Sequence, residues 1–536
     1  MKRIASIFAL FLTIAGYGFA CTNFMAGRDA TVNGDILVSY AADSYSLYGF
    51  LRYQAAADHP EGSVRKITDW DTGKPLGEIP QIGHTYSVVG NMNEHQLAIG
   101  ETTWGGREEL YGDSGIDYGS LIYIALERCR TAREAIDCMT RLVAEYGYAS
   151  EGESFTIADT KEVWILEMIG KGKQEKGAVW VAARVPDDCI SAHANQARIT
   201  QIDLKDKKHE NYLWADDVID FARAKGYFSG KDRDFSFSDT YNPLDFSGKF
   251  VCEARVWSFF RHFTDMSEYY DYAIGKSDKR MPLFIKPDRK VSVQDFQHCM
   301  RDQYEGTPLD ITQGTAAGPW HTKLRYGSLG FKLDSVQYWY ERPIATQQTG
   351  WSFVAQIRPY MPDHIGGIFW FGVDDAATNL YVPMYCRIDQ VPECYREGNG
   401  DLYNYSPTSA FWAFNTVANF AYSKYSDMLP DIRKVQSEWE EYFHQTIPSV
   451  DRAVAEMSPD DARKYLTHFS CMQAQASTES WKKLFEYLLV KYLDGQVRKE
   501  ENGQFKRNEY GEPVGPDRKP FPEEFLRKIA PETEHE

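Results

Sequence analysis

After its first residues, the sequence lacks any long uninterrupted apolar run. No segment beyond Ala20 offers the roughly 20 consecutive apolar residues that a membrane-spanning helix needs. Positive charge is also in short supply, with 59 Lys and Arg against 77 Asp and Glu and a formal net charge of −18. Proteins that bind a phosphate backbone rely on clusters of Lys and Arg. We therefore expect neither stable membrane insertion nor a nucleic-acid partner.

Spacings typical of metal sites are absent as well. The 12 histidines are scattered, and neither His-x-x-x-His nor Cys-x-x-Cys occurs. The glycine-rich stretch "GKGKQEKG" (residues 170–177) joins two expected strands and does not open a helix, so it is typical of a hairpin loop and not of a phosphate site. We therefore predict no metal and no cofactor.

The nine cysteines are an odd number, which suits one reactive thiol and up to four disulfides. Cys386 and Cys394, in "YCRIDQVPECY", are the predicted disulfide pair because a proline-containing loop separates them. The alternative that all eight other cysteines are buried thiols stays open. Ser114, in "GDSG", resembles a serine-protease nucleophile, but it lies where turn and helix-capping residues are expected.

The first 20 residues have the pattern of a secretory signal peptide. A short basic start precedes an apolar run over residues 4–15, and small residues stand at Gly18 and Ala20. Cleavage after Ala20 would make Cys21 the new N-terminus, in the periplasm or outside the cell. Bacterial lipoproteins also begin at a cysteine, but their pattern usually has Leu where this chain has Gly18. A peptide-binding surface lipoprotein without catalytic activity stays open as an alternative.

A cysteine at the N-terminus carries its own base. The α-amino group has an ordinary pKa of about 7.7 to 8.0 and the thiol one near 8.5, so the amine can take up the thiol proton near neutral pH. Before cleavage the nitrogen of Cys21 is an amide, which cannot do so. We therefore expect an enzyme that becomes active only after processing.

The remaining pattern predicts an α+β fold. Alternating apolar residues indicate strands and hairpins up to about residue 180, interrupted by helices over 118–146. Strands return over 349–384, and amphipathic helices follow residue 431. The predicted division of the chain is a signal peptide (1–20), a catalytic domain (21–430), and a helical C-terminal extension with a charged tail (431–536).

Several segments together resemble the dipeptidase A and secernin-like family of cysteine peptidases, cysteine peptidase family sixty-nine. They are "CTNFMAGRDATVNGDILVSYAADS", "GNMNEHQLAIGETTWGG", "SFTIADTKEVWILEMIG", "VPDDCISAHANQARI", "CEARVW" and "SFVAQIRPYMPDHIGGIFWFG". The resemblance implies the αββα four-layer sandwich of N-terminal nucleophile hydrolases. It also implies hydrolysis of dipeptides or short peptides through an acyl-enzyme on Cys21. Another amidase of the same superfamily, cleaving acyl amides such as bile-acid conjugates, is the alternative substrate class.

The resemblance also assigns roles to individual residues. Asp43 matches the acid that holds the nucleophile's amino group, and Asn93 matches an amide donor to the oxyanion. Asn195 matches a second active-site asparagine, and Arg255 an active-site arginine of the wider superfamily. Asn93 also lies in an expected turn, where asparagine is favoured for backbone reasons alone.

Two further points concern the substrate. Many relatives have an arginine at the position of Tyr40, so the chain departs from the family pattern there and its fine specificity is open. Arg255 or Arg198 is the predicted anchor for the substrate carboxylate.

Overall fold

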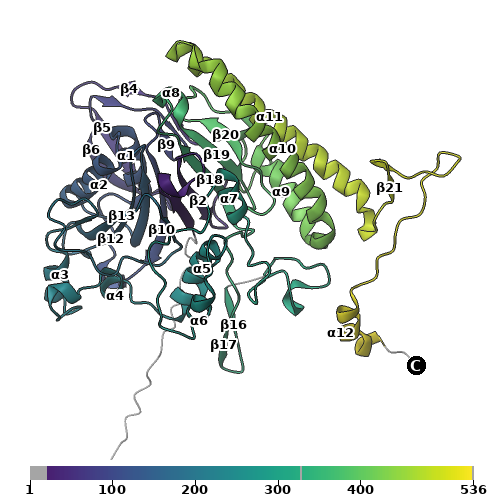
Figure 1. Cartoon of the computed structure of the whole chain (residues 1–536), viewed down its shortest axis with the longest axis horizontal. Coiled ribbons are helices and arrows are strands. Elements are labelled where there is room, and N and C mark those ends of the chain that lie inside the picture. Colours follow the sequence, from purple (N-terminus) through teal and green to yellow (C-terminus); the bar gives the residue numbers. More distant parts are fainter. Residues whose placement is uncertain (1–20, 326–328, 534–536) are drawn as a thin grey trace, which may run out of the picture.

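Two antiparallel β-sheets form the centre of the protein, with helices packed against them (Figure 1). The computed structural model describes residues 21–325 and 329–533. The predicted signal peptide, residues 1–20, lies outside the described residues. The architecture is α+β, as the sequence predicts.

The first sheet has six strands and places the N-terminal strand inside the molecule. In spatial order its strands are β14 (Ile190–His193), β1 (Thr22–Ala26), β2 (Ile36–Asp43), β18 (Thr349–Ile357), β19 (Ile368–Val373) and β20 (Val382–Tyr385). Every residue of β1 and of β2 is buried, because both faces of this sheet are covered. Strand β1 pairs with β2 and β14, so the residue just before β1 starts inside the protein.

The second sheet has eight strands, most of them joined in chain order. In spatial order they are β15 (Tyr212–Trp214), β13 (Ala178–Val185), β12 (Val163–Gly170), β11 (Gly152–Ala158), β10 (Ala98–Gly105), β9 (Met92–Asn93), β8 (Val88–Val89) and β3 (Tyr53–Gln54). The antiparallel pairing of β11 with β12 confirms the hairpin predicted for that stretch.

The two sheets contact each other through β1 and β2 on one side and β10 and β11 on the other. Asn23 of β1 connects them, because its Nδ2 donates a 2.5 Å hydrogen bond to the backbone oxygen of Glu101 in β10. Gly100 makes this approach possible, since a Cβ there would lie 2.3 Å from Asn23 Oδ1. The close contact brings Glu101 next to the start of β1.

Helices α1 (Tyr118–Arg128) and α2 (Ala132–Tyr146) both contact the eight-stranded sheet. The side chain of Asp117 caps α1, and Thr131 with Glu134 forms a capping box at α2, which explains why the predicted helical block divides there. Helices α5 (Ala254–Arg261) and α7 (Val293–Cys299) contact β14 and β18 of the other sheet.

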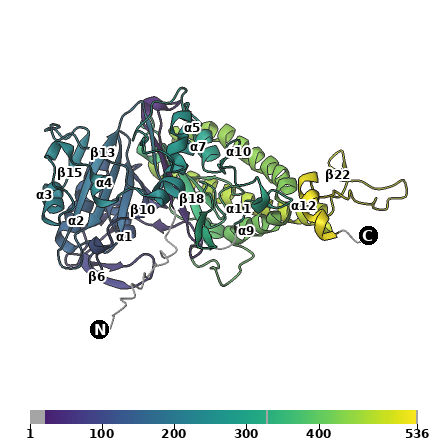
Figure 2. The same cartoon turned by 90° about the horizontal axis from the view of Figure 1, so that it is seen from below.

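Long helices make up the C-terminal part and extend to one side of the body (Figure 2). They are α9 (Ala410–Ala421), α10 (Tyr425–Ala455) and α11 (Pro459–Lys491), followed by the short α12 (Glu523–Thr533). Helix α11 contacts β20 and α9. The helices therefore begin at Ala410, well before the predicted start at residue 431, because the apolar face of α9, with Phe414 and Val417, is buried against the rest of the protein.

Shorter elements connect these parts. They are α3 (Val218–Ala224), α4 (Phe237–Tyr241), α6 (Tyr270–Ala273), α8 (Asp363–Gly366), and the two-stranded sheets β4 (Ala57–Asp58) with β7 (His84–Thr85), β5 (Val64–Thr68) with β6 (Pro75–Pro80), β16 (Gly330–Leu333) with β17 (Val336–Trp339), and β21 (Glu500–Glu501) with β22 (Gln504–Phe505).

The predicted disulfide between Cys386 and Cys394 is not formed, and all nine cysteines are free thiols. The reason is the direction of the side chains. The sulfur of Cys386 faces the backbone oxygen of Asp363, whereas the thiol of Cys394 is hydrogen-bonded to Thr478 of α11. Most of the cysteines are buried free thiols, as the alternative interpretation expects, whereas Cys189 and Cys471 are partly exposed.

Two absences hold for the described part of the chain. No helix within residues 21–325 and 329–533 is long and apolar enough to cross a membrane. Within the same residues, no group of three or more His, Cys, Asp or Glu side chains is arranged to hold a metal ion.

Candidate active site

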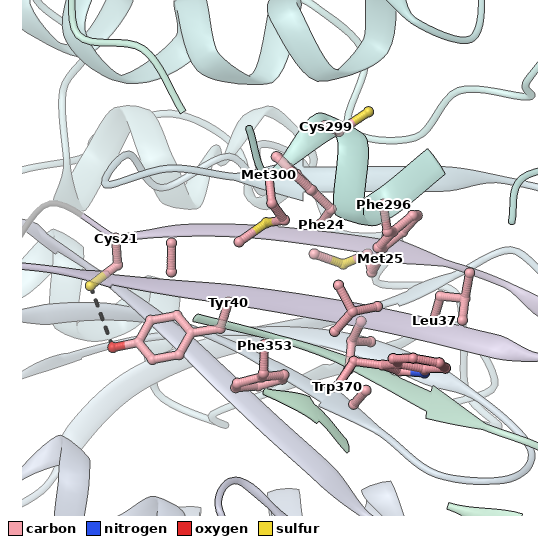
Figure 3. Packing of buried hydrophobic residues seen from close by; sticks show 14 of the residues in the cluster. Cys21, Phe24, Met25, Leu37, Tyr40, Phe296, Cys299, Met300, Phe353 and Trp370 are labelled. Atoms are coloured by element: carbon pink, nitrogen blue, oxygen red, sulfur yellow. Dashed lines mark hydrogen bonds between the residues drawn. The ribbon is translucent and has the colours of Figure 1, made fainter. Parts of the chain in front are cut away.

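Cys21 lies directly before β1 and is 1% exposed. Figure 3 shows its sulfur pointing toward the hydroxyl of Tyr40 on the neighbouring strand β2. The Cys21 sulfur is 3.5 Å from Tyr40 Oη and 3.5 Å from Glu101 Oε1. Tyr40 in turn donates a 2.5 Å hydrogen bond to Glu101 Oε1. The thiol, the phenol and the carboxyl therefore form one buried cluster.

This surrounding makes the thiol a weak acid. Burial, and next the charge of Glu101, raise the pKa of the Cys21 thiol well above its usual value, while the hydrogen bond from Tyr40 acts in the opposite direction. Among the described residues, no histidine hydrogen-bonds to the Cys21 sulfur. The nearby His193 is held between two threonines, and burial lowers its pKa to about 3, so it stays neutral. No histidine among the described residues is therefore placed to take a proton from the thiol.

Glu101, which contacts the Cys21 thiol, forms a pair of carboxyl groups with Glu153. Both are fully buried, and they are hydrogen-bonded to each other. Burial is the largest cause that raises the pKa of each, and for Glu153 the charge of Glu101 is the next. Burial therefore favours the protonated form of both carboxyls, and the hydrogen bond between them requires a proton on at least one.

Asp43, at the end of β2, lies next to Cys21. Its backbone hydrogen-bonds to the Cys21 sulfur, and its carboxylate is held by Arg342 at 2.8 Å and by the hydroxyl of Thr349 at 2.6 Å. Burial raises the pKa of Asp43, and the charge of Arg342 opposes this effect. The Asp43 side chain, paired with Arg342, thus lies near Cys21, and its charge acts on the thiol.

Arg255 and Asn195 also meet at the start of β1. Arg255 is 0% exposed, and it donates to the backbone oxygen of Cys21 at 2.7 Å and to Thr22 Oγ1 at 2.8 Å. Its other nitrogen donates to Asn195 Oδ1 at 2.9 Å. Asn195 has a positive φ of 62°, which asparagine tolerates better than most residues, and its amide donates to the Thr103 backbone at 2.6 Å. The two residues therefore hold the backbone of Cys21 in place.

The predicted anchors for a substrate carboxylate are engaged within the protein. Arg198 pairs with Glu253 at 2.9 Å and donates to the backbone oxygens of Ala192 and Pro282. Arg255 is used by the contacts described above. The described contacts of both guanidinium groups are internal ones and favour a structural role for Arg198 and Arg255. Their role as substrate anchors stays a prediction.

Asn93 does not join this cluster through any of its hydrogen bonds. Its Nδ2 donates to the backbone oxygens of Leu126 and Cys129, each at 2.8 Å. Its Oδ1 accepts from the backbone of His95 and Leu97. The side chain therefore joins the turn after β9 to the end of α1, as the turn interpretation of Asn93 expects. An oxyanion role would require these bonds to break.

Sequence reasoning missed Glu101, Glu153 and Arg342. One signal was available for the two glutamates, because each interrupts an otherwise apolar and small strand, in "AIGETTWG" and "GESFTIA". A charged residue inside a buried strand is rarely tolerated without a partner or a function. Arg342 lies in a loop and had no comparable signal.

Comparison with known proteins agrees with the resemblance found in the sequence. The sequence profile of peptidase family C69 matches residues 20–438. A probable dipeptidase of Latilactobacillus sakei is 26% identical over 472 residues, which are 84% of this chain and 90% of the relative. A probable dipeptidase B of Lactococcus lactis is 23% identical, with 88% and 95% of the two chains covered. A dipeptidase of Bifidobacterium longum is 23% identical, with 82% and 84% covered. The chain belongs to peptidase family C69, and it is therefore a peptidase.

Proposed function

We propose that the protein is an exported cysteine-type dipeptidase whose nucleophile is Cys21. Removal of residues 1–20 frees the α-amino group of Cys21, and the mature enzyme acts in the periplasm or outside the cell. The observation that carries the proposal is the position of Cys21, buried at the start of a central strand with its backbone oxygen held by Arg255. The family profile begins its match at residue 20, which supports a functional start at this point.

The mechanism follows from the weak acidity of the thiol. The free α-amine takes the thiol proton, and the sulfur attacks the substrate carbonyl carbon to give a tetrahedral intermediate. The protonated amine then gives its proton to the leaving amino acid, and the C–N bond breaks to leave a thioester on Cys21. Water, activated by the same amine, hydrolyses the thioester. Asp43 holds the amine in place, while Arg255 and Asn195 keep the Cys21 backbone fixed.

The fold supports the same proposal. The contacts between the two sheets, with α1 and α2 against one sheet and α5 and α7 against the other, support the four-layer αββα arrangement that we propose. In that arrangement residues 21–430 form the catalytic domain, and the helices after residue 431 form an extension.

Hydrolysis of alanyl-alanine by the mature protein, in the presence of a metal chelator, tests the proposal. Cys21→Ala should abolish turnover, and Cys21→Ser should retain a small part of it, since the hydroxyl can use the same amine but is a poorer nucleophile. Cys189→Ala, which removes a free thiol that contacts Asp188, is the matched control and should be silent. Undiminished hydrolysis by Cys21→Ala contradicts the proposal. Faster cleavage of a bile-acid conjugate than of the dipeptide by the wild-type protein favours the acyl-amide alternative.

A further inference from the structure

Two hydrogen-bond donors of strand β2 face the sulfur of Cys21. The hydroxyl oxygen of Tyr40 lies 3.5 Å from this sulfur, and the backbone N–H of Asp43 is hydrogen-bonded to it. Arg255 donates to the backbone oxygen of Cys21 and not to the sulfur. Among the described residues, no Lys, Arg or His hydrogen-bonds to the sulfur. A negative charge on the sulfur would therefore depend on these two neutral donors.

The ring of Tyr40 is held firmly in place. Tyr40 is 6% exposed, and its ring packs edge-on against Trp351 and Phe353, with ring centroids 5.0 and 5.8 Å apart (Figure 3). Gly100 also comes so close that a Cβ there would lie 3.3 Å from Tyr40 Cβ. Close-packed side chains of this kind keep one rotamer. The hydroxyl oxygen therefore stays in place, while its hydrogen can still rotate about the C–O bond.

Two acceptors compete for that hydrogen. Tyr40 donates to Glu101 Oε1 at 2.5 Å, and the thiol of Cys21 donates to the same oxygen at 3.5 Å. A neutral thiol is a weak acceptor, so the carboxyl oxygen receives the hydroxyl hydrogen. A thiolate is a charged acceptor, and hydrogen bonds to ionised groups are roughly twice as strong as neutral ones. Loss of the thiol proton therefore makes the sulfur a strong competitor for the Tyr40 hydrogen.

We infer that Tyr40 is a catalytic hydroxyl: it turns its O–H from Glu101 to the Cys21 sulfur when the thiol loses its proton, and so stabilises the thiolate that attacks the substrate. This inference rests on the proposed role of Cys21 and deepens it by naming a second side chain that touches the reacting atom. The thiol proton still goes to the α-amine, and Tyr40 keeps its own. Burial, and next the charge of Cys21, raise the pKa of the Tyr40 hydroxyl well above its usual value, so the phenol acts as a donor and not as a base.

The pH dependence of Cys21 alkylation tests the inference without relying on turnover. The mature protein is treated with iodoacetamide between pH 5 and 11, and mass spectrometry of the N-terminal peptide gives the rate at Cys21 alone. In Tyr40→Phe the midpoint of this profile should rise by about one unit or more, because the thiolate loses a hydrogen bond. With alanyl-alanine as substrate, kcat should fall by about 10- to 100-fold while KM changes little.

A stronger donor should act in the opposite direction. In Tyr40→3-fluorotyrosine the fluorine adds little volume and makes the phenol more acidic, which strengthens its hydrogen bond to a charged acceptor. The alkylation midpoint should therefore move down. Because this variant keeps the hydroxyl, it tests the inference even where Tyr40→Phe disturbs folding.

Tyr381→Phe is the matched control. It removes a buried hydroxyl that is hydrogen-bonded to Ser352 of the same sheet at 3.1 Å and makes no described contact with Cys21. The alkylation midpoint and kcat should stay unchanged, and urea unfolding of both phenylalanine variants shows how much stability each hydroxyl contributes. A merely structural role of Tyr40 would lower stability and leave the alkylation midpoint where it is.

The outcomes separate the inference from the proposed function. An unmoved midpoint in Tyr40→Phe, or one that moves down, overturns the inference, because the hydroxyl then serves Glu101 alone. An unmoved midpoint in Tyr40→3-fluorotyrosine overturns it as well. If the wild-type protein keeps full dipeptide hydrolysis after complete alkylation of Cys21, the proposed function itself fails, and the inference fails with it whatever the midpoints are.

Discussion

The carboxylate of Asp43 lies 2.8 Å from the guanidinium of Arg342, although 299 positions separate them in the chain. The arginine belongs to a loop, and the aspartate ends a central strand beside Cys21. The ion pair offsets part of the cost of burying the Asp43 carboxyl group, although burial still raises its pKa. In the proposed mechanism this group lies next to the amine that acts as a base.

Asp43→Asn should change the pH dependence of hydrolysis as well as its rate. A nearby carboxylate favours the protonated amine, so its removal lowers the amine pKa, and the free amine becomes available at lower pH. The acid limb of kcat/KM between pH 5 and 9 should move down by about one unit or more. Asp334→Asn, a carboxyl change at the exposed turn between β16 and β17, is the control. An unmoved profile in Asp43→Asn would show that Asp43 does not act on the amine.

Asn93→Ala should lower stability more than turnover. The change leaves the backbone oxygens of Leu126 and Cys129 without their donors, which costs roughly 1–3 kcal/mol of unfolding free energy for each buried group. Urea unfolding and kcat, measured on the same preparation, separate the two effects, with the exposed Asn33→Ala as control. A fall in kcat of about 100- to 1000-fold with unchanged stability would instead support the oxyanion role predicted from the sequence.

Asp374→Asn should stabilise the protein at neutral pH. Burial raises the pKa of Asp374 from 3.8 to about 7, so the folded protein binds this proton more tightly than the unfolded chain. That contribution to stability is fully present below pH 4 and is lost as the pH rises to about 7. Asp374→Asn does not lose this contribution. Its free energy of unfolding should therefore exceed that of the wild type by an amount that grows from near zero at pH 4 to roughly 2–4 kcal/mol at pH 8.

Urea unfolding at pH 4, 6 and 8 measures this difference. Asparagine accepts the positive φ of 64° at this position, so the backbone adds no strain. Asp334→Asn, an exposed residue with a φ of 47°, is the matched control and should show a constant difference. Equal stability of wild type and Asp374→Asn at pH 8 would contradict the shifted ionisation.

The fold was predictable where local pattern decides it. The hairpin of β11 and β12 and the helices over 118–146 follow from alternation, helical periodicity and capping residues such as Thr131. The order of strands in the six-stranded sheet was not predictable, because β2 pairs with β18, more than 300 positions later. Such pairings depend on the packing of the whole chain and leave no local signal.

Part of the candidate site was likewise predictable from the sequence. The signal-peptide pattern pointed to Cys21 as the expected N-terminus, and Asp43, Asn195 and Arg255 lie around it in the structure. The Tyr40 contact with Glu101 was hidden, since it joins two sheets through the approach of Asn23 to Gly100. The assignment of Asn93 depended on a matching motif, and a motif does not reveal which backbone groups already use its amide.

The central claim is that the mature enzyme begins at Cys21 and uses that thiol as its nucleophile. Mass spectrometry of the purified mature protein and of its N-terminal peptide, before and after iodoacetamide, tests it directly. We predict an N-terminal peptide that starts at Cys21 with a free amine, and a loss of dipeptide hydrolysis that runs parallel to alkylation of Cys21. A chain that starts at another residue, a diacylglycerol on Cys21, or full activity after complete alkylation of Cys21 would contradict the account.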